Sequence, residues 1–457
     1  MPAWEGPTDV MSAAAESWAE SRAESRVALL RVVPSVLSSS SYTRTRRRRL
    51  PAAGRCWSHL VMTPFACSRC QQTVFFENHQ CGNCGARLGF VPGLLRLLAW
   101  APDAAIDAPA EGDSGAPLRP CANSSQYGVC NWMLDAGDPH PLCRSCRLNL
   151  TIPDLSQPGH LDRWARVEQA KRRWLYTLLR LGLSPQPKQG PDDALGLGLH
   201  ILAPQPGAEP VMTGHATGLI TLNLDEADDV RREMARAAFG EPWRTLLGHL
   251  RHEGAHYLHH RWIAGDAAAA DEFRAAFGDE RADYGDALMR YHREGPPGDW
   301  ASRYISAYAS AHPHEDWAET CAHWLLVQDA VQTAGAWGLS LHSAAAQADP
   351  AQQPLQALPP DQLLLSQWLP VAQFLNAMNR SLGLSDSYPF LLPPAVVHKM
   401  GVVARLLGRA AAAGGAPANP ANPANPANAA APAPTVPDAG ATAVPTPSPP
   451  SPTITNG

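Results

Sequence analysis

Apolar residues recur every three or four positions over much of the chain after residue 160, which is the spacing of a helix with one buried face. Two short runs, LGLHILAP and GLITLNL, are instead typical of strands. We therefore expect an α+β fold that is mostly helical and holds a small β-sheet. Asp225, Asp279 and Asp299 are expected to cap helices. The spacing predicts helices over residues 162–183, 225–239, 243–260, 266–277, 279–291, 299–309, 314–333, 360–378 and 393–410.

The two ends of the chain lack such a pattern. Residues 1–61 are rich in Ala, Ser and Arg, and residues 411–457 contain the repeat NPANPANPANAA. Segments of this composition bury too little apolar surface to fold, so both are predicted to be disordered. A further hypothesis is that residues 1–61 are not translated and that synthesis starts at Met62. The folded part is then expected to comprise a cysteine-rich module over 62–150 and a larger domain over 151–410.

Eight of the ten cysteines fall within the module, and their spacing is that of metal thiolates rather than of a disulfide framework. Two CxxC pairs that flank a strand-like run form the first set, which predicts a zinc ribbon with four thiolates. Redox dithiols or a rubredoxin-like iron site are the alternatives for that set. The second set is expected to close another four-thiolate zinc site. The first set is Cys67, Cys70, Cys81 and Cys84; the second is Cys121, Cys130, Cys143 and Cys146.

The run HEGAH carries the candidate chemistry of the larger domain. Positions i and i+4 share one helix face, so His252 and His256 can bind the same zinc ion. Glu253 lies beside such an ion and is placed to take a proton from its water. A five-residue motif also arises by chance, so a third ligand is needed. Downstream, Glu315 and Glu319 are candidates, and His323, four residues after Glu319, is another.

Charge and hydropathy exclude several classes of function. The net charge is −5 and no folded segment carries a basic stripe, so no nucleic-acid partner is expected. No run of eighteen apolar residues exists, so no membrane span is expected. The order of basic and apolar residues near the start is not that of a secretory signal, and we expect a cytoplasmic protein.

Several motifs occur together in an order that resembles bacterial zinc-binding metallopeptidases with an N-terminal zinc-ribbon module. They include LCRSCRLNLTIPDL, GLITLNLDEADD, LLGHLRHEGAHY, GDERADYGDAL and AYASAHPHEDWAET, between residues 67 and 333. The arrangement is similar to the gluzincins, which implies a zincin-like fold. From the pattern Y-x6-E-x3-E, the resemblance implies that Tyr308 assists the oxyanion, Glu315 is the third ligand and Glu319 supports a ligand from behind. One departure is that the family commonly reads HEIGHY, whereas this chain has Gly254-Ala255 before His256.

The expected function is hydrolysis of peptide bonds by a zinc-activated water, with Glu253 as general base. One catalytic and two structural zinc ions are expected, with a peptide or protein substrate. Residues 218–223 could be an edge strand that pairs with an extended substrate, or an ordinary strand of the sheet. An alternative function is a zinc-ribbon scaffold with an inactive peptidase-like domain, in which the ribbon binds a protein partner. A third is an enzyme that cuts only its own chain, or only one protein partner, with the ribbon module as a lid or docking arm.

Overall fold

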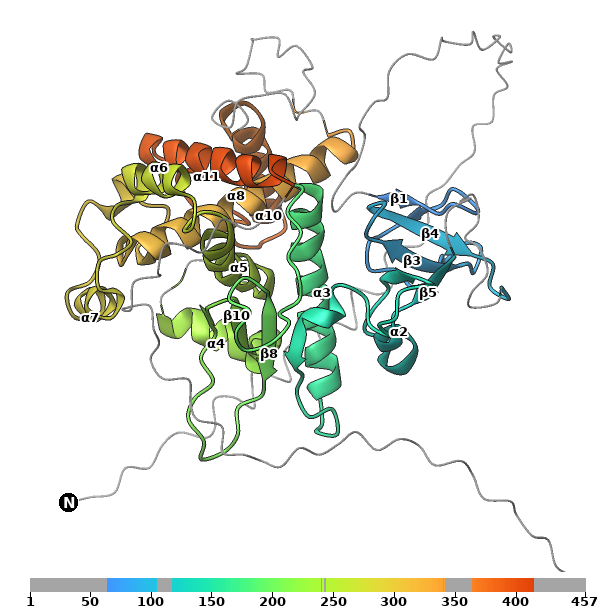
Figure 1. Ribbon diagram of the computed structural model, residues 1–457. Coiled ribbons are helices and arrows are strands. Elements are labelled where there is room, and N and C mark those ends of the chain that lie inside the picture. Colours follow the sequence, from blue (N-terminus) through green and yellow to red (C-terminus); the bar gives the residue numbers. More distant parts are fainter. Residues whose placement is uncertain are drawn as a thin grey trace, which may run out of the picture. The chain divides into compact units, whose positions relative to one another are not determined.

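The computed structural model describes residues 64–104, 117–239, 241, 244–339, 341 and 364–414 (Figure 1). The predictions for residues 1–61 and for the tail beyond residue 414 lie outside these ranges. None of the described helices is both long and apolar enough to cross a membrane.

The cysteine-rich module consists of three short antiparallel strand pairs. Aromatic rings fill its centre, and Phe76 contacts Phe90 edge-to-face at 4.9 Å between ring centroids. The strands are β1 (Phe65–Ala66), β2 (Thr73–Val74), β3 (Arg87–Val91), β4 (Arg96–Trp100), β5 (Leu118–Pro120) and β6 (Met133–Asp135), with helix α2 (Ala122–Tyr127) and turn η1 (Cys146–Leu148).

A four-stranded sheet follows, with the order β7-β8-β10-β9. Its strands are β7 (Asn149–Thr151), β8 (Gly198–Leu202), β9 (Gly214–Ala216) and β10 (Leu219–Asn223). Strands β7, β8 and β10 are parallel, while β9 runs antiparallel to β10. The run predicted over 218–223 is therefore an inner strand with neighbours on both sides, and the interpretation as an edge strand is wrong. The edge is β9, a segment too short and too polar to stand out in the sequence.

Helices make up most of the remaining fold, which confirms the predicted α+β class. Helices α5 and α8, which carry the HEGAH run and the downstream glutamates, pack directly against each other. The helical elements are α3 (His160–Arg180), η2 (Leu224–Ala227), α4 (Asp229–Phe239), α5 (Leu246–Trp262), α6 (Ala267–Phe277), α7 (Tyr284–Glu294), η3 (Trp300–Ser302), η4 (Tyr308–Ser310), α8 (Pro313–Ala336), η5 (Leu364–Trp368), α10 (Leu369–Ser381) and α11 (Pro394–Ala412).

The helix predicted over 299–309 is wrong, because the chain forms only the short turns η3 and η4 there. Three serines explain the difference. Ser302 donates to the carbonyl of Asp299, and Ser310 donates to that of Ala307. Ser306 accepts a hydrogen bond from a backbone amide three residues later. Side-chain bonds of this kind offer the backbone an alternative to the helical ladder.

The predicted caps also need correction. Asp225 does not cap a helix; Asn223 caps η2 instead, by accepting from the amide of Asp225. Helix α7 begins five residues later than predicted and is capped by Asp283, not by Asp279. Asp299 makes no capping hydrogen bond.

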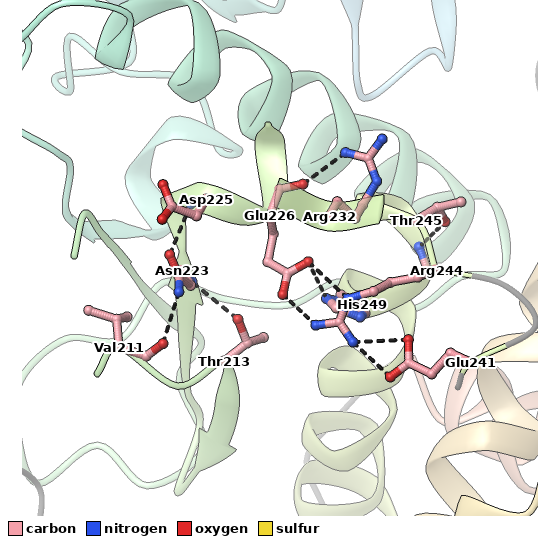
Figure 2. Close-up of polar contacts among 11 residues, drawn as sticks. Val211, Thr213, Asn223, Asp225, Glu226, Arg232, Glu241, Arg244, Thr245 and His249 are labelled. Carbon is pink, nitrogen blue, oxygen red and sulfur yellow. Dashed lines mark hydrogen bonds and ion pairs between the residues drawn. The ribbon is translucent and has the colours of Figure 1, made fainter. Parts of the chain in front are cut away.

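Polar contacts fix the start of α5 (Figure 2). Arg244 donates to Glu226 and to Glu241, with its NH2 atom 2.5 Å from Oε1 of Glu226. Thr245 caps α5 by accepting from a backbone amide at 2.9 Å. The Nδ1 atom of His249 lies 3.4 Å from Oε2 of Glu226. Because Glu226 lies in the turn after β10, these contacts tie the sheet to the helix that carries the HEGAH run.

Candidate active site and metal centres

His252 and His256 lie on one face of α5, with ring centroids 5.0 Å apart. Glu315, in the first turn of α8, points a carboxylate at both rings. Its Oε2 lies 3.1 Å from Nε2 of His252, and its Oε1 lies 3.5 Å from Nε2 of His256. The ligand atoms of all three residues lie within 4.8 Å of one another. The structure thus brings together the two predicted histidines and the glutamate that the resemblance implies.

This donor set fits a zinc ion. Four ligands at about 2.0–2.1 Å in a tetrahedron are separated from one another by roughly 3.3 Å, close to the separations seen here. Glu315 is 1% exposed in its side chain, yet its Oε2 accepts no hydrogen bond from the described residues. A buried carboxylate oxygen without a hydrogen-bond donor is costly, and a bound cation would remove that cost. Burial lowers the pKa of His256 to about 4, whereas for His252 burial is outweighed by hydrogen bonds to Glu315 and Glu319, which raise its pKa.

Glu319 lies behind His252 rather than at the centre of the site. Its Oε1 accepts from Nδ1 of His252 at 2.7 Å, and its Oε2 accepts from the hydroxyl of Ser306 at 2.8 Å. A carboxylate on Nδ1 fixes the ring orientation and leaves Nε2 free to bind a metal. The other candidate, His323, contacts the hydroxyl of Tyr388 at 2.9 Å and does not belong to the ligand cluster.

Tyr284 is a site residue that the sequence analysis missed. Its hydroxyl donates to Oε1 of Glu315 at 2.8 Å. It lies in the motif GDERADYGDAL, which was used only to support the resemblance. With Ser306, which holds Glu319, it forms a polar shell around the candidate ligands. The motif that this chain shares with the family is the one feature of the sequence that points to Tyr284.

Replacing Tyr284 with phenylalanine is expected to weaken zinc binding at the histidine site by about 10–100-fold, as removal of such an outer hydrogen bond does elsewhere. The carboxylate of Glu315 would lose the donor that fixes its rotamer. The measurement is competition against a chromophoric chelator. Tyr127→Phe is the control, because the Tyr127 hydroxyl contacts Gln126 in the cysteine-rich module. Equal affinities for Tyr284→Phe and wild type would show that Tyr284 does not support the ligand.

Glu253 is buried beside this cluster, being 9% exposed, but it is not part of the ligand set. Burial raises the pKa of its carboxyl to about 7; the His252 ring opposes that shift, while the carboxylates of Glu315 and Glu319 add to it. A carboxyl that titrates near neutral pH can both accept and return a proton.

Tyr308 also lies near His252, with 6.3 Å between the two ring centroids. Burial raises the pKa of its hydroxyl, and the nearby carboxylates of Glu315 and Glu253 raise it further. The hydroxyl therefore stays protonated and can donate a hydrogen bond.

The eight module cysteines form two separate clusters of four. In the first, Sγ atoms approach to 3.8 Å for Cys67 and Cys84 and to 3.6 Å for Cys70 and Cys81. In the second, Cys130 and Cys143 approach to 3.7 Å. A tetrahedron with Zn–S bonds of about 2.3 Å has edges of roughly 3.8 Å, so both clusters fit zinc. All eight are free thiols rather than disulfides.

The second cluster contacts a buried ion pair that lies within α3. The Sγ atom of Cys146 lies 3.8 Å from Oε2 of Glu168, and Glu168 accepts from Lys171 at 2.8 Å. Both charged side chains are fully buried. Arg172 also donates to the carbonyl of Val129 in the module. Helix α3 therefore contacts the cysteine-rich module through Glu168 and Arg172.

The same helix supports α5 at Gly254. A Cβ atom added to Gly254 would lie 2.3 Å from Cζ2 of Trp174, a distance that real contacts do not reach. The carbonyl of Ala255, the position at which the resemblance implies glycine, accepts from Nε1 of Trp317 at 2.8 Å. In the HEGAH run, the residue that must be small is therefore Gly254, because the Trp174 indole of α3 packs directly against it.

Gly254→Ala is expected to destabilise the protein by about 1–3 kcal/mol, although alanine is the better helix former. The rigid indole of Trp174 cannot yield without moving α3. Chemical denaturation measures the change. Gly408→Ala in α11 is the matched control, since its Cβ would meet no atom within 4 Å, and a gain of about 0.5–1 kcal/mol is expected there. A Gly254→Ala protein as stable as wild type would contradict the packing described.

The two cysteine clusters and the histidine site have the donor sets of a zinc-binding protein with a zinc ribbon. The family model described as "putative zinc-binding metallo-peptidase" matches residues 160–406, and a zinc-ribbon domain matches residues 64–157. The chain belongs to this metallopeptidase family.

Three relatives, one from Mycobacterium bovis and two from strains of Mycobacterium tuberculosis, are named as uncharacterized proteins. Each is 40% identical over 339 residues, which cover 74% of this chain and 93% of the relative. No solved structure matches the chain.

Proposed function

We propose that the protein is a zinc-dependent peptidase with its active centre at His252, His256 and Glu315. The observation that carries the proposal is the convergence of these three ligands beside the buried Glu253. A zinc ion held there supplies Lewis-acid activation of a water molecule and of the scissile carbonyl. The two cysteine clusters are proposed to hold structural zinc, giving three ions per chain.

Glu253 is proposed to act as general base, and then to return the proton to the leaving amine. Its pKa near 7 suits both steps, since a base works best when its pKa lies close to the working pH. Tyr308 is proposed to donate to the oxyanion. Glu319 and Tyr284 hold His252 and Glu315 in place through the contacts at 2.7 and 2.8 Å.

The edge strand β9 is the proposed docking edge for an extended peptide. It lies next to α5, and the ring of its central residue, His215, stacks near that of His256 at 6.2 Å. Among the described residues, β9 is paired on one side, with β10. A peptide added as a further strand would pass beside the proposed ligands.

Incubation of the zinc-loaded full chain with a peptide library, followed by mass spectrometry, tests the function. We expect new peptide termini from wild type, none after zinc is removed with a chelator, and recovery when zinc is returned. Glu253→Gln separates this activity from a contaminating protease. If wild type and Glu253→Gln cleave equally, or if neither cleaves, the peptidase proposal is contradicted. The alternative function, a zinc-ribbon scaffold, would then take its place.

A further inference from the structure

A pocket of about 280 Å³ lies beside the C-terminal half of α7. Its walls are one face of that helix from Ala287 to Glu294, the segment 295–297 and the residues Ser310 and Ala311. Tyr291 belongs to the wall and contacts the ring of Tyr308 edge-to-face at 5.9 Å. The rings of Tyr291 and Tyr308 therefore link the pocket to His252, since the Tyr308 ring lies 6.3 Å from that of His252.

Arg290 gives this pocket its charge. It lines the pocket, is exposed, and has no ion-pair partner within the described part of the chain. Asp286 and Glu294, four positions away on the same helix, form no ion pair with it in the described structure. Glu294 also lines the pocket, but its carboxylate accepts from Arg293 at 2.6 Å. The pocket thus presents a free guanidinium beside a carboxylate that already has a cation.

We propose that this pocket is a specificity site that binds an acidic side chain of the peptide substrate. A planar guanidinium binds a carboxylate through two parallel hydrogen bonds, which a glutamine or alanine side chain cannot reproduce. The volume is large enough for an aspartate or glutamate side chain. The inference rests on the proposed function, because it places the pocket next to the peptide at the zinc site.

The test uses the full-length, zinc-loaded Glu253→Gln chain, which should bind peptides without cutting them. Fluorescein-labelled heptapeptides with Glu, Gln, Ala or Lys at one position, scanned along the peptide, are titrated and followed by anisotropy. We expect the Glu peptide to bind about fivefold more tightly than the Gln peptide at one position, a modest factor because the pocket is open to solvent. Adding Arg290→Gln should abolish that difference, and Arg290→Glu should shift the preference to Lys.

Arg281→Gln is the matched control, since it removes one exposed positive charge that is paired with Asp279 and does not line the pocket. It should retain the preference for Glu. The same preference in Arg290→Gln, or no preference for an acidic residue at any position, would overturn the proposal. If the protein selects Glu peptides but wild type cleaves no peptide, the pocket proposal is supported and the peptidase proposal is contradicted. If wild type cleaves peptides but shows no preference for acidic residues, the peptidase proposal is supported and the pocket proposal is contradicted.

Discussion

Replacing Glu253 with glutamine is expected to lower kcat by about 10²–10⁴-fold, the usual contribution of a general base. Glutamine has nearly the same shape but cannot accept a proton. Glu253 is not among the residues whose ligand atoms cluster around the proposed zinc position. The zinc content should therefore stay at the wild-type value, and the loss should appear in kcat rather than in metal binding. The measurement is steady-state cleavage of the best library peptide, together with elemental analysis.

Glu233→Gln is the control for this variant. Glu233 is an exposed glutamate of α4 that pairs with Arg236, so its removal should leave kcat unchanged. A Glu253→Gln protein that keeps wild-type kcat would show that another group accepts the proton. Loss of zinc from Glu253→Gln would instead show that Glu253 supports the metal site.

A large loss of stability is expected when Asp329 in α8 is replaced with alanine, because its carboxylate binds side chains of two other helices. Its Oδ2 accepts from Arg251 of α5 at 2.6 Å, and its Oδ1 accepts from the Thr177 hydroxyl of α3 at 2.8 Å. Arg180 of α3 lies 3.9 Å away. Asp329→Ala would leave Arg251 buried without its counter-ion, and removal of one partner of a buried ion pair typically costs about 3–5 kcal/mol. Urea unfolding of the zinc-loaded protein measures this loss.

A surface aspartate provides the comparison. The Asp271 side chain is 79% exposed and pairs with Arg274, and such surface pairs contribute at most about 1 kcal/mol. The free energy of unfolding of Asp271→Ala should thus be close to that of wild type. Because Arg251 immediately precedes His252, Asp329→Ala is also expected to bind the histidine-site zinc less tightly. Equal stabilities of the two variants would contradict the role given to Asp329.

The parts of the site that sequence predicts are those set by local geometry. His252 and His256 share a helix face because four residues make about one turn. The cysteine spacings predict clusters in the same way, and the Sγ distances fit that expectation. Helical spacing likewise predicts α3, α5 and α8, whose apolar faces form the core.

The remaining features depend on contacts between distant segments. Glu315 and Glu319 are equivalent by spacing alone, and only the resemblance separates their roles. In the structure, Ser306 and Nδ1 of His252 hold Glu319, while Tyr284 holds Glu315. The edge strand β9 has only three residues, too few to show a period. No local pattern encodes these arrangements, since each depends on how helices and sheet pack.

The presence of a zinc ion at His252, His256 and Glu315 is tested by elemental analysis of zinc per chain on purified wild type, His256→Ala and Glu315→Ala. We expect about three zinc ions in wild type and about two in each variant, because the cysteine clusters do not depend on these residues. Only two ions in wild type, with no change in either variant, would contradict it: the HEGAH helix would then hold no metal.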